Sequence, residues 1–133
     1  MMHPATSRDG WFTDPDNMSV DPAGRLWVCT DGPPPEGVAD ALYVMDTEGP
    51  ARALPKLFYV APVGSEVCSP AFTPDGRTVF LSIQHAGELR MADDEDAESL
   101  AEAGTRWPDF ADGVPPRPSV VVLTRADGRE VGV

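Results

Sequence analysis

Four side chains that carry oxygen ligands flank the apolar, strand-like runs of this sequence: Asp16, Asn17, Asp31 and Glu66. Asp16 and Asn17 stand at the start of one run, Asp31 follows the end of the next, and Glu66 begins a later one. Carboxylate and amide oxygens are the ligands that Ca²⁺ prefers, and it takes about six to eight of them. We therefore expect these four side chains to supply about half of a calcium shell.

Two further candidates, His85 and Glu88, follow the end of another strand-like run. Imidazole can bind a metal or transfer a proton near neutral pH, although a single histidine at a strand end is more often structural. The sequence contains no nucleophile elbow, no cysteine-histidine pairing at a known spacing and no phosphate-binding glycine loop. Hydrolysis would therefore need water activated by a metal, and no catalytic residue is assigned.

The elements that must position these residues repeat along the chain. Gly24-Arg25, Gly76-Arg77 and Gly128-Arg129 lie 52 positions apart, each after a short turn. A period near 50 in a chain of short strands is typical of β-propeller blades. The expected strands are residues 17–20, 26–30, 41–46 and 51–60 in the first repeat, and 67–72, 78–83 and 119–124 in the second.

We predict an all-β fold of about two four-stranded antiparallel blades, an incomplete propeller, because propellers have about four to eight blades. Residues 1–133 would be a single fragment, with one blade at 11–63, another at 64–133 and a long insertion at 86–118 in the second. The insertion contains an acidic run at 93–96 and a candidate helix at 97–103. In antiparallel strands, the start of one strand and the end of the next lie at the same end of the sheet, so the candidate ligands should converge there.

The composition of the chain limits the kinds of partner that it can bind. The chain has 22 acidic and 10 basic residues, for a formal charge of −12. This charge repels a phosphate backbone, so we expect no nucleic-acid binding, and it favours cations. No apolar run approaches about 18 residues, so we expect no membrane span. The first residues lack a basic patch followed by an apolar stretch, and we expect a cytoplasmic chain if it is expressed as given.

Two cysteines, Cys29 and Cys68, lie 39 positions apart without the spacing of a zinc or redox motif. Both stand in apolar runs, and we expect them to be buried and inert, with a disulfide between them left open. Trp27 lies in an alternating run and is expected to pack in a core.

Several stretches together resemble a known family. The first is Pro15 to Trp27 with Thr30-Asp31-Gly32; the others are Gly64 to Val67, Phe72 to Thr78 and Ile83 to Glu88. They are similar to the C-terminal part of the PhoX-type alkaline phosphatases, which are exported, six-bladed propellers that depend on calcium and iron. The strand expected at 119–124 fits the end of that family.

The resemblance implies a phosphomonoesterase in which Ca²⁺ and iron bind the phosphate ester and activate the attacking oxygen. It assigns acidic ligand roles to Asp16, Asp31 and Glu66, with Asn17 as a supporting neighbour. His85 and Glu88 match the motif without an assigned role.

This chain also departs from the pattern. The family's iron ligands, a cysteine among them, come from earlier blades, and neither cysteine here replaces it. Ser65 stands where the pattern has cysteine, and Cys68 where it has threonine. We therefore expect no phosphatase activity from this chain alone.

Two alternatives stay open. Pro15-Asp16-Asn17 followed by Asp21-x-x-Gly24-x-Leu26-Trp27 is also similar to calcium-dependent lactonase propellers of the gluconolactonase type, against which Gln84-His85-x-Gly87-Glu88 argues. The other alternative is a non-catalytic binding or scaffold fragment. Under every reading, two blades leave open faces and edges, so we expect self-association or partner blades from a missing N-terminal part.

Overall fold

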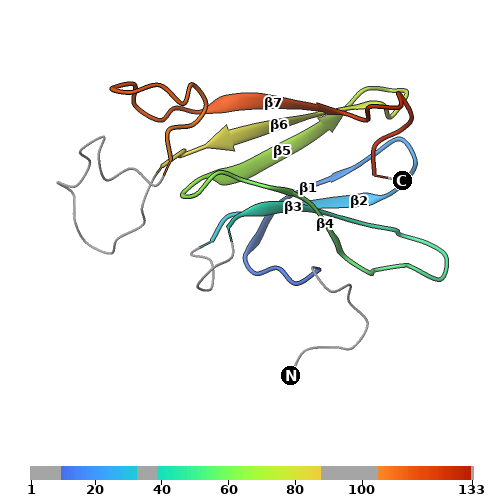
Figure 1. The fold of residues 1–133 in the computed structure, drawn as a ribbon. Coiled ribbons are helices and arrows are strands. Elements are labelled where there is room, and N and C mark those ends of the chain that lie inside the picture. The colour runs from blue at the N-terminus through green and yellow to red at the C-terminus, as the bar shows by residue number, and fades with distance from the viewer. Residues whose placement is uncertain (1–9, 33–38, 88–104, 133) are drawn as a thin grey trace.

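The computed structural model describes residues 10–32, 39–87 and 105–132, and within them the chain forms seven strands in two antiparallel sheets without a helix (Figure 1). In the described part of the chain there is thus no helix of the length and apolar character needed to cross a membrane. The all-β class and the architecture of incomplete propeller blades are confirmed. The strands are β1 (Pro15–Val20), β2 (Leu26–Thr30), β3 (Ala41–Met45), β4 (Lys56–Val60), β5 (Glu66–Phe72), β6 (Thr78–Gln84) and β7 (Ser119–Thr124).

The first sheet is a four-stranded meander in the order β1-β2-β3-β4. The turn between β1 and β2 closes with a hydrogen bond of 2.9 Å from the Gly24 N–H to the Asp21 carbonyl. Gly24 has a φ of +83°, which a residue with a side chain rarely adopts. The register places Met18 opposite Val28, so the turn chemistry sets which side chains share a face.

The second sheet has three strands in the order β5-β6-β7 rather than the expected four. After the turn at Gly128 the chain leaves the sheet instead of pairing with β7. The Val131 N–H donates to the Gly76 carbonyl at 2.9 Å, and the Val131 side chain is buried in the core. Burial of this apolar side chain stabilises the position of the C-terminal segment, which makes no strand ladder with β7.

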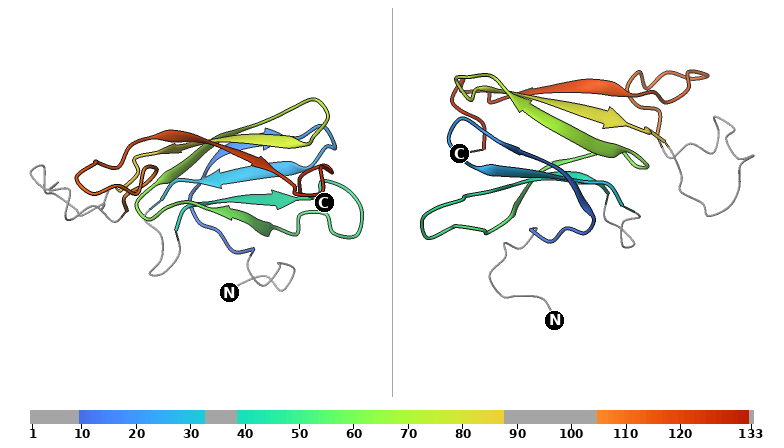
Figure 2. Two further views of the ribbon diagram at one scale, coloured as in Figure 1. Left: turned by 45° about the horizontal axis from the view of Figure 1, so that its top comes forward. Right: turned by 180° about the vertical axis from the view of Figure 1, so that it is seen from behind.

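The core lies between the two sheets, which form two layers (Figure 2). Trp27 and Cys29 enter it from β2, and Val79 and Leu81 enter it from β6, 52 positions later in each case. The Trp27 ring lies 5.1 Å from the ring of Phe72 on β5, measured between centroids. The predicted packing role of Trp27 is confirmed, and equivalent positions of the two repeats share one core.

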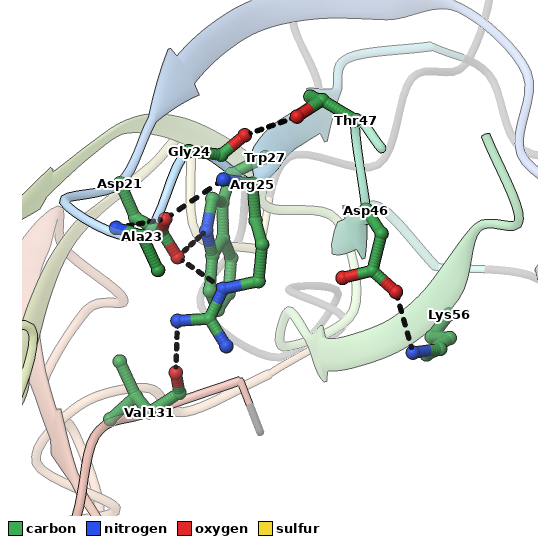
Figure 3. A network of polar contacts seen from close by, with 9 residues as sticks. All are labelled: Asp21, Ala23, Gly24, Arg25, Trp27, Asp46, Thr47, Lys56 and Val131. Atoms are coloured by element: carbon green, nitrogen blue, oxygen red, sulfur yellow. Dashed lines mark hydrogen bonds and ion pairs between the residues drawn. The ribbon is translucent and has the colours of Figure 1, made fainter. Parts of the chain in front are cut away.

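A buried polar network joins the first turn to the C-terminal segment (Figure 3). Asp21 Oδ2 accepts hydrogen bonds from Arg25 Nε at 2.6 Å and from Trp27 Nε1 at 2.9 Å. The other carboxylate oxygen accepts the backbone N–H groups of Ala23 and Arg25. Arg25 Nη2 then donates to the Val131 carbonyl at 2.8 Å. The Asp21 carboxylate therefore binds the backbone of the first turn and the side chains of Arg25 and Trp27. Arg25 also binds the C-terminal segment.

Part of the expected insertion packs on the second sheet. Trp107 Nε1 donates to Ser119 Oγ at 2.6 Å, and the guanidinium of Arg117 makes two hydrogen bonds to the Asp109 carboxylate. The acidic run at 93–96 and the helix expected at 97–103 lie outside the described residues. The division into blades at 11–63 and 64–133 remains a prediction.

Candidate metal centre

Three side chains with metal-ligating atoms meet where the two sheets adjoin. They are Asp16 on β1 and Glu66 and Cys68 on β5, and their ligand atoms all lie within 4.8 Å of one another. We call this set the acid-thiol cluster. β1 and β5 each form an edge of their sheet and lie against each other. The structure therefore brings Asp16 and Glu66 together, and their role as metal ligands remains a prediction.

The 52-residue repeat accounts for this meeting. Asp16 and Cys68 occupy equivalent positions in the two repeats, as do Asn17 and Ser69. Ser69 Oγ donates to Asn17 Oδ1 at 3.1 Å, and the Asn17 amide nitrogen donates to the Asp16 carboxylate. Asn17 therefore links Asp16 of the first sheet to Ser69 of the second, and its role as a supporting neighbour of a metal ligand remains a prediction.

Cys68 is the member that the sequence analysis missed. Its burial was predicted correctly, since the side chain is only 6% exposed, but it lies beside carboxylates rather than among apolar groups alone. The thiol donates to Glu66 Oε1, and Gln84 Nε2 donates to Cys68 Sγ at 2.8 Å. The usable signal was the spacing: residues two apart in a strand share a face, so Glu66 and Cys68 must be neighbours.

His85 lies at the edge of the cluster. Its Nε2 is 3.7 Å from Glu66 Oε2, and its side chain is about half exposed. The residue has a φ of +53°, in the left-handed region, directly after the end of β6. This backbone conformation ends the strand and brings the imidazole within reach of the Glu66 carboxylate.

Two of the predicted site residues, Asp31 and Glu88, are not placed in the cluster by the described part of the chain. Asp31 follows the end of β2, where its N–H donates to the Asp14 carbonyl at 3.1 Å. Its carboxylate is not a member of the acid-thiol cluster among the residues that the structure describes. Glu88 lies outside the described residues. Metal-ligand roles for both residues remain predictions.

Two members of the cluster, Glu66 and Cys68, are buried, whereas Asp16 is exposed. Glu66 is buried, with 7% of its surface exposed. Burial raises the pKa of the Cys29 thiol to about 12, and the nearby charges of Asp16 and Glu66 add to this effect. Burial, followed by the hydrogen bond to Glu66 and its charge, raises the pKa of Cys68 to about 12. An anion is therefore disfavoured beside these carboxylates and a cation is favoured.

Both cysteines are free thiols, so the disulfide that the sequence left open is not formed. The donors of the cluster fit a metal ion in type: two carboxylates, a thiol, and an imidazole within reach. These donors are too few to fill the coordination shell of Ca²⁺, which takes about six to eight oxygen ligands. The cluster fits part of a metal site.

Repeated antiparallel strands that form separate sheets around a shared core are the architecture of β-propeller blades. The family model described as alkaline phosphatase PhoX matches residues 2–87, well over half of the sequence, and the chain belongs to this family. The match includes all three members of the acid-thiol cluster and ends before β7. No curated protein and no solved structure matched the sequence.

Proposed function

We propose that this chain is part of a metal-dependent phosphatase that hydrolyses phosphate monoesters, and that the acid-thiol cluster is its share of the metal centre. The observation that supports this most directly is the overlap of the two findings. The segment that matches the PhoX family is the segment in which Asp16, Glu66 and Cys68 converge. The catalytic residues of the complete protein are not assigned.

The residues of this chain would bind the metal ion and orient the side chains that coordinate it. Bound Ca²⁺ or iron supplies Lewis-acid stabilisation of the phosphoryl group and an activated water. The carboxylates of Asp16 and Glu66 are the ligands we propose first, with Asn17 fixing the orientation of Asp16. Asp31 and His85 are proposed as further ligands or partners of the ester. Ca²⁺ suits the oxygen donors, whereas the family's iron would need ligands from other blades.

An incomplete metal centre gives a direct test. We expect the purified chain to retain a metal ion after dialysis against Ca²⁺ and iron, as measured by elemental analysis, and to show no turnover of p-nitrophenyl phosphate. Its donors fill only part of a coordination shell. Robust metal-dependent turnover by the chain alone would refute the incomplete centre, and failure to retain any metal would refute the site. Turnover of a lactone in a parallel assay would instead favour the lactonase alternative.

The outer face of the second sheet supports a proposal about assembly. Phe80 on β6 lies directly opposite Val122 on β7, and Val120 lies on the same face. All three side chains are substantially exposed. Adjacent exposed apolar side chains of this kind mark interaction surfaces. We propose that other blades cover this face in the complete protein, and that a second copy covers it in the isolated chain.

Sedimentation equilibrium should therefore give a mass well above the 14.2 kDa of one chain. Substitution of both Phe80 and Val122 with serine should shift the equilibrium toward the monomer, because it removes apolar area from the contact. Serine at the exposed Glu48 is the control and should leave the mass unchanged. A monomer at every concentration would contradict the proposal.

The family is generally exported. We propose that the complete protein acts outside the cytoplasm, where phosphate esters would be its substrates.

A further inference from the structure

The second repeat places a thiol where the first repeat places a carboxylate. Cys68 follows Asp16 by 52 positions, and Sγ of Cys68 lies within 4.8 Å of the carboxylates of both Asp16 and Glu66. Ser65, which precedes Glu66, has a buried hydroxyl without a hydrogen-bond partner among the described residues. The second repeat therefore places its thiol, rather than this hydroxyl, among the ligand atoms.

Of the two hydrogen bonds of Cys68, the one donated to Glu66 keeps the proton on the sulfur and the one accepted from Gln84 suits a sulfur that has lost it. Its S–H points to Glu66, so an ion bound between the two groups would take the place of that proton. Gln84 Nε2 donates to the same sulfur at 2.8 Å, and this bond would remain. The Gln84 position is set by the β5-β6 register, which pairs Glu66 with Gln84. A donor of this kind orients a thiolate ligand and stabilises its charge.

Cys29 provides a natural comparison within the same chain. It is fully buried, and the charges of Asp16 and Glu66 influence it as well. Its sulfur is nevertheless not a member of the acid-thiol cluster in the part of the chain that the structure describes. The two thiols thus share a similar environment and differ in access to the position that an ion would occupy.

We propose that Cys68 is a thiolate ligand that makes this site select a transition-metal ion over Ca²⁺. The inference rests on the proposed function, because it requires a cation at the acid-thiol cluster. On binding, the S–H bond breaks, the proton passes to solvent, and the sulfur lone pair forms the bond to the metal. Ca²⁺ takes oxygen ligands, whereas thiolate favours ions such as zinc and iron.

Cobalt(II) is the probe, because a thiolate-cobalt bond gives a charge-transfer absorption band in the near ultraviolet that oxygen ligands do not give. The full chain is titrated with Co²⁺ and, separately, with Ca²⁺. We expect the band in the parent chain and in Cys29→Ser, and its loss in Cys68→Ser. The Cys68→Ser chain should bind Co²⁺ at least about tenfold more weakly, with its Ca²⁺ affinity little changed.

Cys68→Thr is a second variant that introduces the residue of the family pattern, and circular dichroism establishes that each variant is folded. A band that persists in Cys68→Ser and Cys68→Thr, or that disappears equally in Cys29→Ser, would overturn the proposal. Binding of Co²⁺ or Ca²⁺ without any band in the parent chain would overturn it and leave the proposed function standing. Absence of binding by both ions would overturn the two together.

Discussion

Replacing Asp21 with alanine should lower the free energy of unfolding by about 3 to 5 kcal/mol, the usual effect of removing one partner of a buried ion pair. The side chains of Asp21 and Arg25 are 1% and 9% exposed. Without the carboxylate, Arg25 keeps a buried charge and Trp27 keeps a buried N–H without its acceptor. Since domains are stable by only about 5 to 15 kcal/mol, the loss should be plain in a urea titration.

Asp127 provides the matched control, because it belongs to the third Gly-Arg turn and pairs with Arg125 and Arg129 at the surface. Exposed pairs are weak, so Asp127→Ala should leave the urea midpoint close to that of the parent. Equal effects of the two substitutions would contradict the assignment of Asp21 as a buried anchor.

The same carboxylate predicts a pH dependence. Burial alone would raise the pKa of Asp21, but the hydrogen bonds from Trp27 and Arg25 outweigh it and hold the pKa below its ordinary value of 3.8. The stabilisation is therefore complete above that value and is lost as the pH falls through the lower pKa of the folded state. In urea titrations below about pH 4 the parent chain should lose stability, and Asp21→Asn should lose less over the same range.

Replacing Glu66 with glutamine should weaken cation binding by at least about 100-fold, since even residues that only hydrogen-bond a metal ligand contribute about 10- to 100-fold. Glutamine keeps the shape of the side chain and removes its charge, so the effect should be on affinity. Isothermal titration with Co²⁺ and Ca²⁺ measures it. Glu48→Gln, an exposed residue outside the cluster, should bind as the parent does.

Urea unfolding with and without metal distinguishes a metal ligand from a residue that only stabilises the fold. A buried carboxylate is costly without a cation, so the metal-free Glu66→Gln chain should unfold at the same urea concentration as the metal-free parent or a higher one. The parent should gain stability when metal is added, and the variant should not. A variant that binds within about threefold of the parent would refute Glu66 as a ligand, because the loss of a ligand should exceed that of its neighbours.

Local patterns determined most of the secondary structure. The strands expected at 26–30 and 119–124 coincide with β2 and β7, and the turns at Gly24 and Gly76 were placed correctly. Alternation of apolar residues and the backbone freedom of glycine act over a few residues, so they can be read directly from the sequence. The antiparallel order of the expected strands also predicted that the side chains of Asp16 and Glu66 would converge.

The sequence by itself determined the all-β class and most of the strand positions, because these depend on spacing within a strand or a repeat. Only the tertiary structure decided that Cys68 joins Asp16 and Glu66, that Asp21 pairs with Arg25 and Trp27 in the interior, and that Val131 leaves the second sheet. These outcomes depend on which faces of two sheets meet and which polar groups become buried there. Strand periodicity states which side chains share a face, but the neighbour across the interface is chosen by packing.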